Sequence, residues 1–297
     1  MKTKKTFITP YRAWCFLLFM VLSLSLCLPG LITNNTNPAS YYNIEIASVP
    51  TSAMLPIIMY HATHHKNTGK YTLHPDQLER DFIYLTQNGY TAITVKDLLN
   101  YIDNDVPLPK KPVMLTFDDG SLTNYLYAFP LLQKYNLRAV FAVVGAWLDD
   151  NYDKDGNVIK SGSNINYEQL RTMIDSGLVE VQSHSYDMHK NKERVGMRQK
   201  KGECETEYRA ALKEDLEKVK KRLRDKAGAE VNAIIYPYGA FSKLTEEVIK
   251  DLGYRAAFTC TEGINYINKD TDLFLLKRYN RPSGISSEMF FSKMTGQ

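Results

Sequence analysis

Short apolar runs alternate with amphipathic stretches from Leu55 to the end of the chain. An apolar run such as "PVMLTF", residues 112–117, predicts a strand buried on both faces, and the amphipathic stretches predict helices. This alternation is typical of a parallel sheet covered by helices. The expected strands are residues 56–61, 90–95, 112–117, 138–145, 179–184, 233–239, 254–259 and 274–280, and the expected helices are residues 75–88, 123–135, 166–176, 204–226, 243–252 and 286–294.

Eight strands with helices between them and no internal linker favour a single (β/α) barrel over two domains, with an open doubly wound sheet as the alternative. The sequence has no GxGxxG and no P-loop motif, so nothing indicates a nucleotide site. The expected helix at 204–226 is dense in Glu and Lys, which usually marks a solvated face, and we interpret it as scaffold. We therefore expect one α/β domain.

The first 32 residues differ from the rest of the chain. Lys2, Lys4, Lys5 and Arg12 precede residues 13–32, which carry no charge and are rich in Leu, Phe, Met and Val. About 20 apolar residues are enough to span a bilayer, and the positive flank keeps this end cytoplasmic. We expect a signal peptide or an N-terminal membrane anchor at 1–32, a polar linker at 33–53, and an exported domain at 54–297.

The exported part is electrically neutral. Four of the 37 Lys and Arg residues lie in residues 1–38, which hold no Asp or Glu, so the remainder has 33 residues of each sign. A nucleic-acid partner is not expected, because a phosphate backbone needs a clustered basic face. Cys204 and Cys260 are the two cysteines outside the apolar segment, and they form either one disulfide or two free thiols.

Polar residues follow several expected strands at the end where a barrel of this kind has its active site. They are His61 at the end of the first strand, Asp118 and Asp119 after the third, His184 and His189 at and after the end of the fifth, Tyr238 in the sixth, and Arg278 and Arg281 at the last. Three of the six histidines therefore gather on one rim of the predicted barrel.

Adjacent carboxylates at Asp118 and Asp119 repel each other unless a cation offsets their charge. One Asp and two His make a three-ligand face that leaves positions for water or substrate, as a catalytic metal site requires. If one Asp binds a divalent cation, the other stays ionised beside it as a base. The sequence therefore predicts a metal site with a neighbouring carboxylate base.

The motifs "TFDDG", "SHSYDMH" and "YPYG" resemble those of the polysaccharide deacetylases, the family 4 carbohydrate esterases, over roughly residues 55–295. The pattern is most similar to the branch that contains poly-N-acetylglucosamine deacetylases. The resemblance implies a distorted (β/α) barrel in a single catalytic domain. It also implies metal-dependent hydrolysis of an N-acetyl group on an amino sugar.

The resemblance assigns roles to matching residues. Asp118 is similar to the general base and Asp119 to the metal-binding carboxylate of the family. His184 and His189 match the two metal-binding histidines, although "HSYDMH" is one residue longer than the common family spacing. Tyr238 matches the position whose backbone N–H helps to stabilise the oxyanion.

Three departures from the family pattern stand out. The Arg of the third motif, which holds the catalytic Asp, is missing from "AIIYPYG", and Arg278 or Arg281 is expected to replace it. The late "IxLxH" motif is absent, but "IIMYH" at the start of the domain resembles it, so His61 is expected to be the general acid. First and last strands are neighbours in a closed barrel, which would bring His61 to the same rim. The fourth motif, with its Asp and Trp, has no match, because neither Trp14 nor Trp147 fits it.

The expected reaction is hydrolysis of an acetamide on a polysaccharide or oligosaccharide, either peptidoglycan or poly-N-acetylglucosamine, by a monomer outside the cytoplasm. Zinc suits one carboxylate and two imidazoles, while cobalt, nickel or iron also fit these ligand types. Glycoside hydrolysis by paired carboxylates is disfavoured, because neighbouring residues point to opposite sides of a strand. The alternative from another class is a non-catalytic carbohydrate-binding protein that retains the fold.

Overall fold

The structure, a computed structural model, describes residues 52–159 and 163–295. The expected signal peptide or anchor at 1–32 and nearly all of the expected linker at 33–53 lie outside the described residues. Strand β1 (Ala53–Leu55) begins at the last residue of that linker, one position before the expected domain. No helix within the described ranges is long and apolar enough to cross a membrane.

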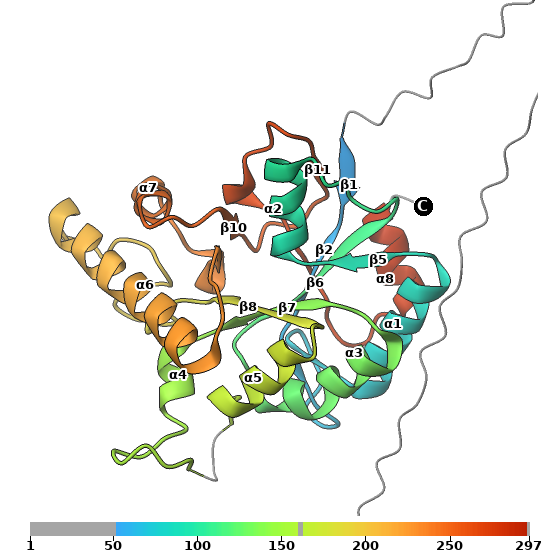
Figure 1. Cartoon of the computed structure of the whole chain (residues 1–297), viewed down its shortest axis with the longest axis horizontal. Coiled ribbons are helices and arrows are strands. Elements are labelled where there is room, and N and C mark those ends of the chain that lie inside the picture. The colour runs from blue at the N-terminus through green and yellow to red at the C-terminus, as the bar shows by residue number, and fades with distance from the viewer. Residues whose placement is uncertain (1–51, 160–162, 296–297) are drawn as a thin grey trace, which may run out of the picture. The chain divides into compact units, whose positions relative to one another are not determined.

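Eight strands form one curled, all-parallel sheet, as the alternating sequence pattern predicts. Figure 1 shows the sheet at the centre, with α1, α3 and α8 together on one side and α4, α6 and α7 on the other. The order across the sheet is β10-β9-β8-β7-β6-β2-β12, with β5 paired to the first half of β6. The strands are β2 (Ile57–Tyr60), β5 (Thr91–Ile93), β6 (Pro112–Phe117), β7 (Ala139–Val143), β8 (Val179–Ser183), β9 (Ala233–Ile235), β10 (Ala256–Phe258) and β12 (Tyr279–Asn280).

Residues 276–281 connect the two edges of the curled sheet. The N–H of Leu276 donates to the carbonyl of Ala257 on the β10 side at 3.0 Å, while β12 pairs with β2. The curled sheet is an irregular barrel. Strand β12 has only two residues, and β6 pairs with β5 at its start but with β7 at its end. Along the chain, β2 is the first strand of this sheet and β12 is the last. The two are neighbours, as the barrel prediction requires.

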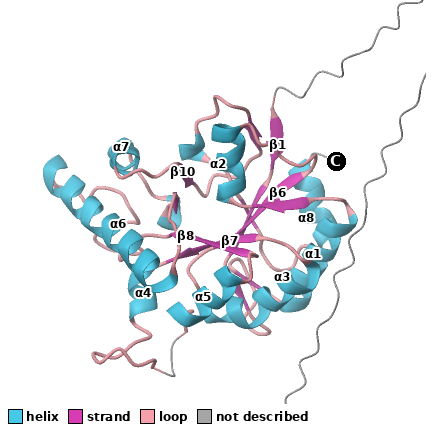
Figure 2. Ribbon diagram, viewed as in Figure 1, coloured by secondary structure: helices cyan, strands magenta, loops and turns pink. Residues whose placement is uncertain are grey.

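Helices cover the outside of the sheet (Figure 2). Two further pairs of short strands lie outside this sheet, one antiparallel and one parallel. The helices are α1 (Pro75–Gln87), α2 (Val95–Asn104), α3 (Phe129–Tyr135), α4 (Gly145–Asp149), α5 (Tyr167–Asp175), α6 (Glu205–Ala227), α7 (Lys243–Asp251) and α8 (Ser287–Thr295), with a π-helical turn η1 (Asn124–Ala128) before α3 and 3-10 turns η2 (Pro237–Gly239) and η3 (Leu273–Leu275). The additional strands are β1 with β11 (Asn265–Ile267), and β3 (Ala62–Thr63) with β4 (Thr72–Leu73).

Every expected strand except residues 112–117 is shorter in the structure, and two differ most from the prediction. The strand at 233–239 ends at Ile235, because Pro237 has no N–H for a ladder and begins η2 instead. The strand at 274–280 is wrong over its first half, where η3 forms because the Asp272 side chain accepts the N–H of Phe274. Helices α2 and α4 were not predicted.

Strand residues alternate between two apolar clusters. Ile57 and Met114 belong to one cluster with the side chains of α2, while Ile58 and Leu115 belong to the cluster under the outer helices. The alternation follows from the period of two along a strand. Thr116 and then Asp118 continue the face of Met114, so the sheet itself aims Asp118 toward the inside of the curl.

Candidate active site

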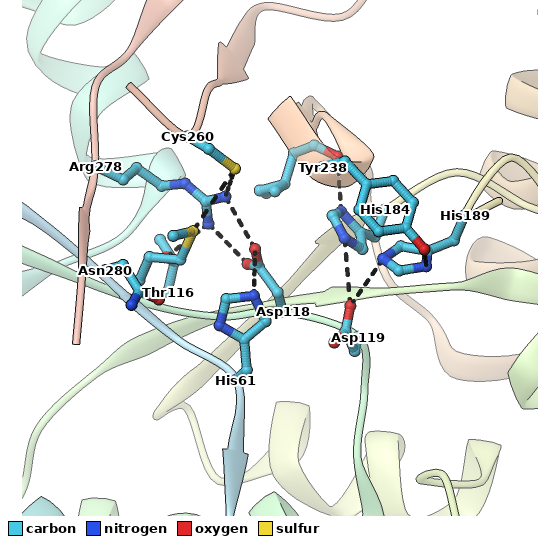
Figure 3. A network of polar contacts seen from close by, with 12 residues as sticks. His61, Thr116, Asp118, Asp119, His184, His189, Tyr238, Cys260, Arg278 and Asn280 are labelled. Carbon is cyan, nitrogen blue, oxygen red and sulfur yellow. Dashed lines mark hydrogen bonds and ion pairs between the residues drawn. The ribbon is translucent and has the colours of Figure 1, made fainter. Parts of the chain in front are cut away.

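Strand β6 ends in two adjacent carboxylates that point in different directions (Figure 3). Asp119 and Gly120 both have a left-handed backbone, with φ of 74° and 78°. Gly120 is required there, since a Cβ atom would also lie 3.1 Å from the Val143 side chain. This turn separates the two carboxylates, so that Asp118 is 2% exposed and Asp119 30% exposed.

Asp119, His184 and His189 form a compact three-residue cluster. The Oδ1 atom of Asp119 lies 3.4 Å from Nε2 of His184 and 3.2 Å from Nε2 of His189, and the three potential ligand atoms all lie within 4.8 Å of one another. Burial raises the pKa of the Asp119 carboxyl, but the two adjacent imidazoles outweigh this effect and hold the pKa well below its ordinary value. The carboxylate is therefore ionised and available as a ligand.

The two imidazoles are oriented by contacts on their outer nitrogens. Nδ1 of His184 lies 2.8 Å from the carbonyl oxygen of Ile235, which can only accept, so Nδ1 carries a proton; in the neutral ring, Nε2 then has the lone pair that a metal ligand needs. Nδ1 of His189 lies 3.2 Å from the hydroxyl of Tyr238, so its Nε2 also faces Asp119. Outer contacts of this kind orient metal-binding histidines.

The cluster fits a divalent metal ion on its own geometry. Oδ1 of Asp119 is buried and has no hydrogen-bond donor among residues 52–159 and 163–295. A buried carboxylate oxygen between two imidazole nitrogens, with no donor bonded to it, needs a cation to compensate its charge. One oxygen and two nitrogens are ligands that suit zinc and its neighbours in the first transition series.

Asp118 is held by a buried arginine. Nη1 and Nη2 of Arg278 donate to Oδ1 and Oδ2 of Asp118 at 2.7 and 2.9 Å, and Arg278 has no exposed surface. Nη1 also donates to the Thr116 hydroxyl at 3.1 Å, and Nε to the carbonyl of Thr259 at 2.9 Å. Burial raises the pKa of Asp118, but Arg278 and the nearby histidines outweigh burial and keep the pKa below its ordinary value.

Arg281, the other arginine considered for this role, lies elsewhere. Its Nε and Nη2 bind Oδ2 and Oδ1 of Asp81 on α1 at 2.8 and 2.9 Å, and both side chains are fully buried. The hydroxyls of Tyr60 and Ser287 donate to the same carboxylate. Arg281 therefore ties the end of β12 to α1 and α8, and Arg278 is the arginine beside Asp118.

His61 and Tyr238 complete the group of residues that the sequence singled out. Nε2 of His61 lies 4.0 Å from Oδ2 of Asp118, and its buried Nδ1 has no hydrogen-bond partner within the described part of the chain. Burial lowers the pKa of His61, against the opposing effect of Asp118 and Asp119. Tyr238 has a left-handed backbone (φ 58°), and its side chain is 47% exposed beside His189.

Sequence reasoning missed three side chains at this site. The ring of Tyr71 lies 4.7 Å from that of His61, and the ring of Trp147 lies 4.9 Å from that of His189. The free thiol of Cys260 lies 3.9 Å from Nη2 of Arg278. A pocket of about 400 Å³ is lined by His61, Tyr71, Asp119, His189, Tyr238 and Cys260, among others. No sequence signal marks these three, because Tyr71 and Cys260 lie in connecting segments and Trp147 lies in α4, a short helix that was not predicted. Cys204 is also a free thiol.

A curled parallel sheet with this cluster at its strand ends defines the class of the protein. The model of the family described as polysaccharide deacetylase matches residues 105–257, just over half of the chain. The chain belongs to the polysaccharide deacetylase family, as its motifs predict.

Named relatives and a solved structure narrow the comparison. A poly-β-1,6-N-acetyl-D-glucosamine N-deacetylase of Escherichia coli (strain K12) is 30% identical over 213 residues, which cover 63% of this chain and 30% of the relative. The enzyme with the same description from Staphylococcus aureus (strain MRSA252) is 27% identical over 230 residues, covering 77% of this chain and 73% of the relative. The structure of a de-N-acetylase from Aggregatibacter actinomycetemcomitans matches with a TM-score of 0.69 at 24% identity, covering 82% of this chain and 99% of that chain. This last likeness shows the fold.

Proposed function

We propose that this protein is a metal-dependent hydrolase that removes N-acetyl groups from a poly-β-1,6-N-acetylglucosamine-type polysaccharide. The observation that carries the proposal is a carboxylate fixed by Arg278 directly beside a second carboxylate that faces two imidazoles. The substrate class is supported by the descriptions of the E. coli and S. aureus relatives. Peptidoglycan is the second substrate to test, because its amino sugars carry the same acetamide.

Asp119, His184 and His189 would hold the ion, with zinc first and cobalt, nickel or iron next on ligand type. When bound, the ion lowers the pKa of a coordinated water and polarises the acetyl carbonyl. The polar contacts on Nδ1 of both histidines would keep each Nε2 directed at the ion.

The chain's own residues supply the proton transfers. Asp118, ionised and fixed by Arg278, accepts a proton from the attacking water as the water oxygen bonds to the carbonyl carbon. The backbone N–H of Tyr238 stabilises the resulting oxyanion. Protonated His61, 4.0 Å from Asp118, gives a proton to the sugar nitrogen as the C–N bond breaks, which leaves acetic acid and a free amine; the proton taken up by Asp118 then restores protonated His61, and the acid ionises to acetate on release.

The site would act outside the cytoplasm on an exported polymer. The uncharged residues 13–32 behind a positive N-terminus support export of the domain, with or without retention at the membrane.

Acetate release from β-1,6-linked N-acetylglucosamine oligomers and from peptidoglycan tests the proposal. The protein is stripped with a chelator and re-supplied with zinc or cobalt. We expect activity on the β-1,6 oligomers to return with the metal. In Asp118→Asn, acetate release should fall by about 10²- to 10⁴-fold, the usual contribution of a general base. Zinc affinity should be retained, because Asp118 is not a ligand.

Two outcomes would contradict the proposal. Activity that survives complete removal of metal would exclude metal dependence. Tight binding of the oligomers without acetate release, on any metal, would favour the carbohydrate-binding alternative.

A further inference from the structure

The loop between the two histidines of the site has all of its backbone N–H groups bonded. The N–H of Ser185 donates to Oγ of Ser183 at 3.1 Å, and that of Met188 to Oγ of Ser185 at 3.0 Å. The two remaining N–H groups, of Tyr186 and Asp187, donate to Oδ1 and Oδ2 of a single carboxylate at 2.7 Å each. That carboxylate belongs to a residue of α6, Asp215.

Asp215 is a buried acid without a charged partner. Its side chain is 9% exposed, and no Lys, Arg or His within residues 52–159 and 163–295 forms an ion pair with it. Burying a carboxylate is costly unless hydrogen bonds compensate it. The two N–H groups of the loop provide that compensation, so the carboxylate and the loop stabilise each other.

The other sides of the loop are held by α4 and by the same face of α6. The N–H groups of Gly145 and Ala146 donate to the carbonyls of Ser185 and Tyr186 at 3.0 and 2.8 Å. The Tyr186 hydroxyl donates to Asp149 at 2.9 Å, and Nζ of Lys218, one turn beyond Asp215, lies 3.8 Å from the centre of the Tyr186 ring. The loop therefore has one well-defined path from His184 to His189.

We propose that Asp215 is a positioning residue that sets the affinity of the site for its metal ion, because it fixes the loop that presents His189. The inference rests on the proposed metal-dependent function. Its physical basis is geometric: a ligand that must move into place on binding loses affinity relative to one already in place. Asp215 makes no contact with the substrate pocket and acts only through the loop.

The test uses the full chain with Asp215→Asn. An amide accepts one N–H through its oxygen and presents its own N–H₂ to the other, so one of the two loop contacts becomes a clash of donors. We expect zinc affinity, measured by competition with a chromophoric chelator, to fall by about 10- to 100-fold, as for other outer contacts of metal ligands. The absorption spectrum of the cobalt form should change, since it reports ligand geometry.

Asp225→Asn is the matched control. It makes the same chemical change on the same helix, at a side chain that is 42% exposed and pairs with Lys221. Its zinc affinity and cobalt spectrum should equal those of the wild type. Equal zinc affinity of wild type and Asp215→Asn would overturn the inference, even if Asp215→Asn lowers the melting temperature of the metal-free protein.

A second variant covers the case in which Asp215→Asn does not fold. Tyr186→Phe keeps the ring under Lys218 and removes the hydroxyl bond to Asp149. We expect a smaller, several-fold loss of zinc affinity, and an unchanged affinity would again overturn the inference. A wild-type protein that binds no zinc, cobalt, nickel or iron would instead contradict the proposed function itself.

Discussion

At the scale of single residues, the pair of Asp118 and Arg278 joins positions 160 apart in the sequence. Both side chains are buried, and the guanidinium binds both carboxylate oxygens. A buried carboxylate keeps its charge only while such a partner is present. Arg278 holds the proposed base, which is the role of the third-motif arginine that this chain lacks.

Arg278→Met should damage both activity and stability. It leaves Asp118 buried without its partner, which typically costs about 3–5 kcal/mol in the free energy of unfolding. Acetate release should fall by about 10²-fold or more, because the base loses both donors that fix it. Zinc affinity should change little, since no metal ligand is touched. Urea unfolding, acetate assays and chelator competition measure the three effects, and an active Arg278→Met would contradict the assignment.

The residues of the site differ in how far the sequence predicts them. Asp118 and Asp119 follow a clear apolar strand, so their place at a strand end can be predicted from the period of two and from the turn at Gly120. The choice of Arg278 over Arg281 cannot be predicted in this way. They lie three positions apart, and only the path of residues 276–281 decides which arginine reaches Asp118 and which reaches Asp81.

At the scale of secondary-structure elements, a second buried pair of Asp and Arg holds β12 against α1 and α8. Asp81→Asn leaves Arg281 buried and unpaired, and the free energy of unfolding should fall by about 3–5 kcal/mol. Acetate release and zinc affinity should stay near wild type at temperatures where the variant is folded, since Asp81 lies outside the proposed site. Chemical unfolding with parallel assays distinguishes it from Arg278→Met, and a folded but inactive Asp81→Asn would contradict this division.

The sequence misleads most where polar elements face other polar elements. Helix α6 was interpreted as a solvated scaffold, yet Asp215, Lys218, Arg222 and Lys226, at helical spacing, face the loop of Tyr186 and the carboxylate of Asp149. Apolar periodicity identifies which face of a helix is buried, but it carries no information about a charged stripe that contacts a charged loop. Strand ends are hard to predict for a related reason. Pro237 ends β9, and the capping side chain of Asp272 begins η3, but neither residue changes the apolar pattern.

At the scale of the whole molecule, the proposed metal ligands come from separate parts of the sheet. Asp119 follows β6, His184 follows β8, and His189 ends the loop beyond it, so the complete site exists only in the folded state. A ligand that binds only the folded state stabilises it by about 2.7 kcal/mol at a concentration 100 times its Kd.

Zinc at that concentration should therefore raise the melting temperature by roughly 5–10 °C for a domain of this size. Calorimetry of the metal-free and zinc-loaded protein measures the shift. Asp119→Asn, which removes the carboxylate ligand, is the control and should lose most of it. A shift of the same size in Asp119→Asn would place the zinc elsewhere.

Residues 276–281, which join the two edges of the sheet, also determine when the site exists during biosynthesis. A ribosome makes the proposed metal ligands, the proposed base and the proposed acid long before it reaches Arg278. Until that late segment docks between β10 and β2, Asp118 lacks the guanidinium that holds both of its oxygens, and the two edges of the curled sheet are not joined. On this view the proposed hydrolytic activity requires residues 276–281 to have been synthesised and docked, however early the other site residues are made.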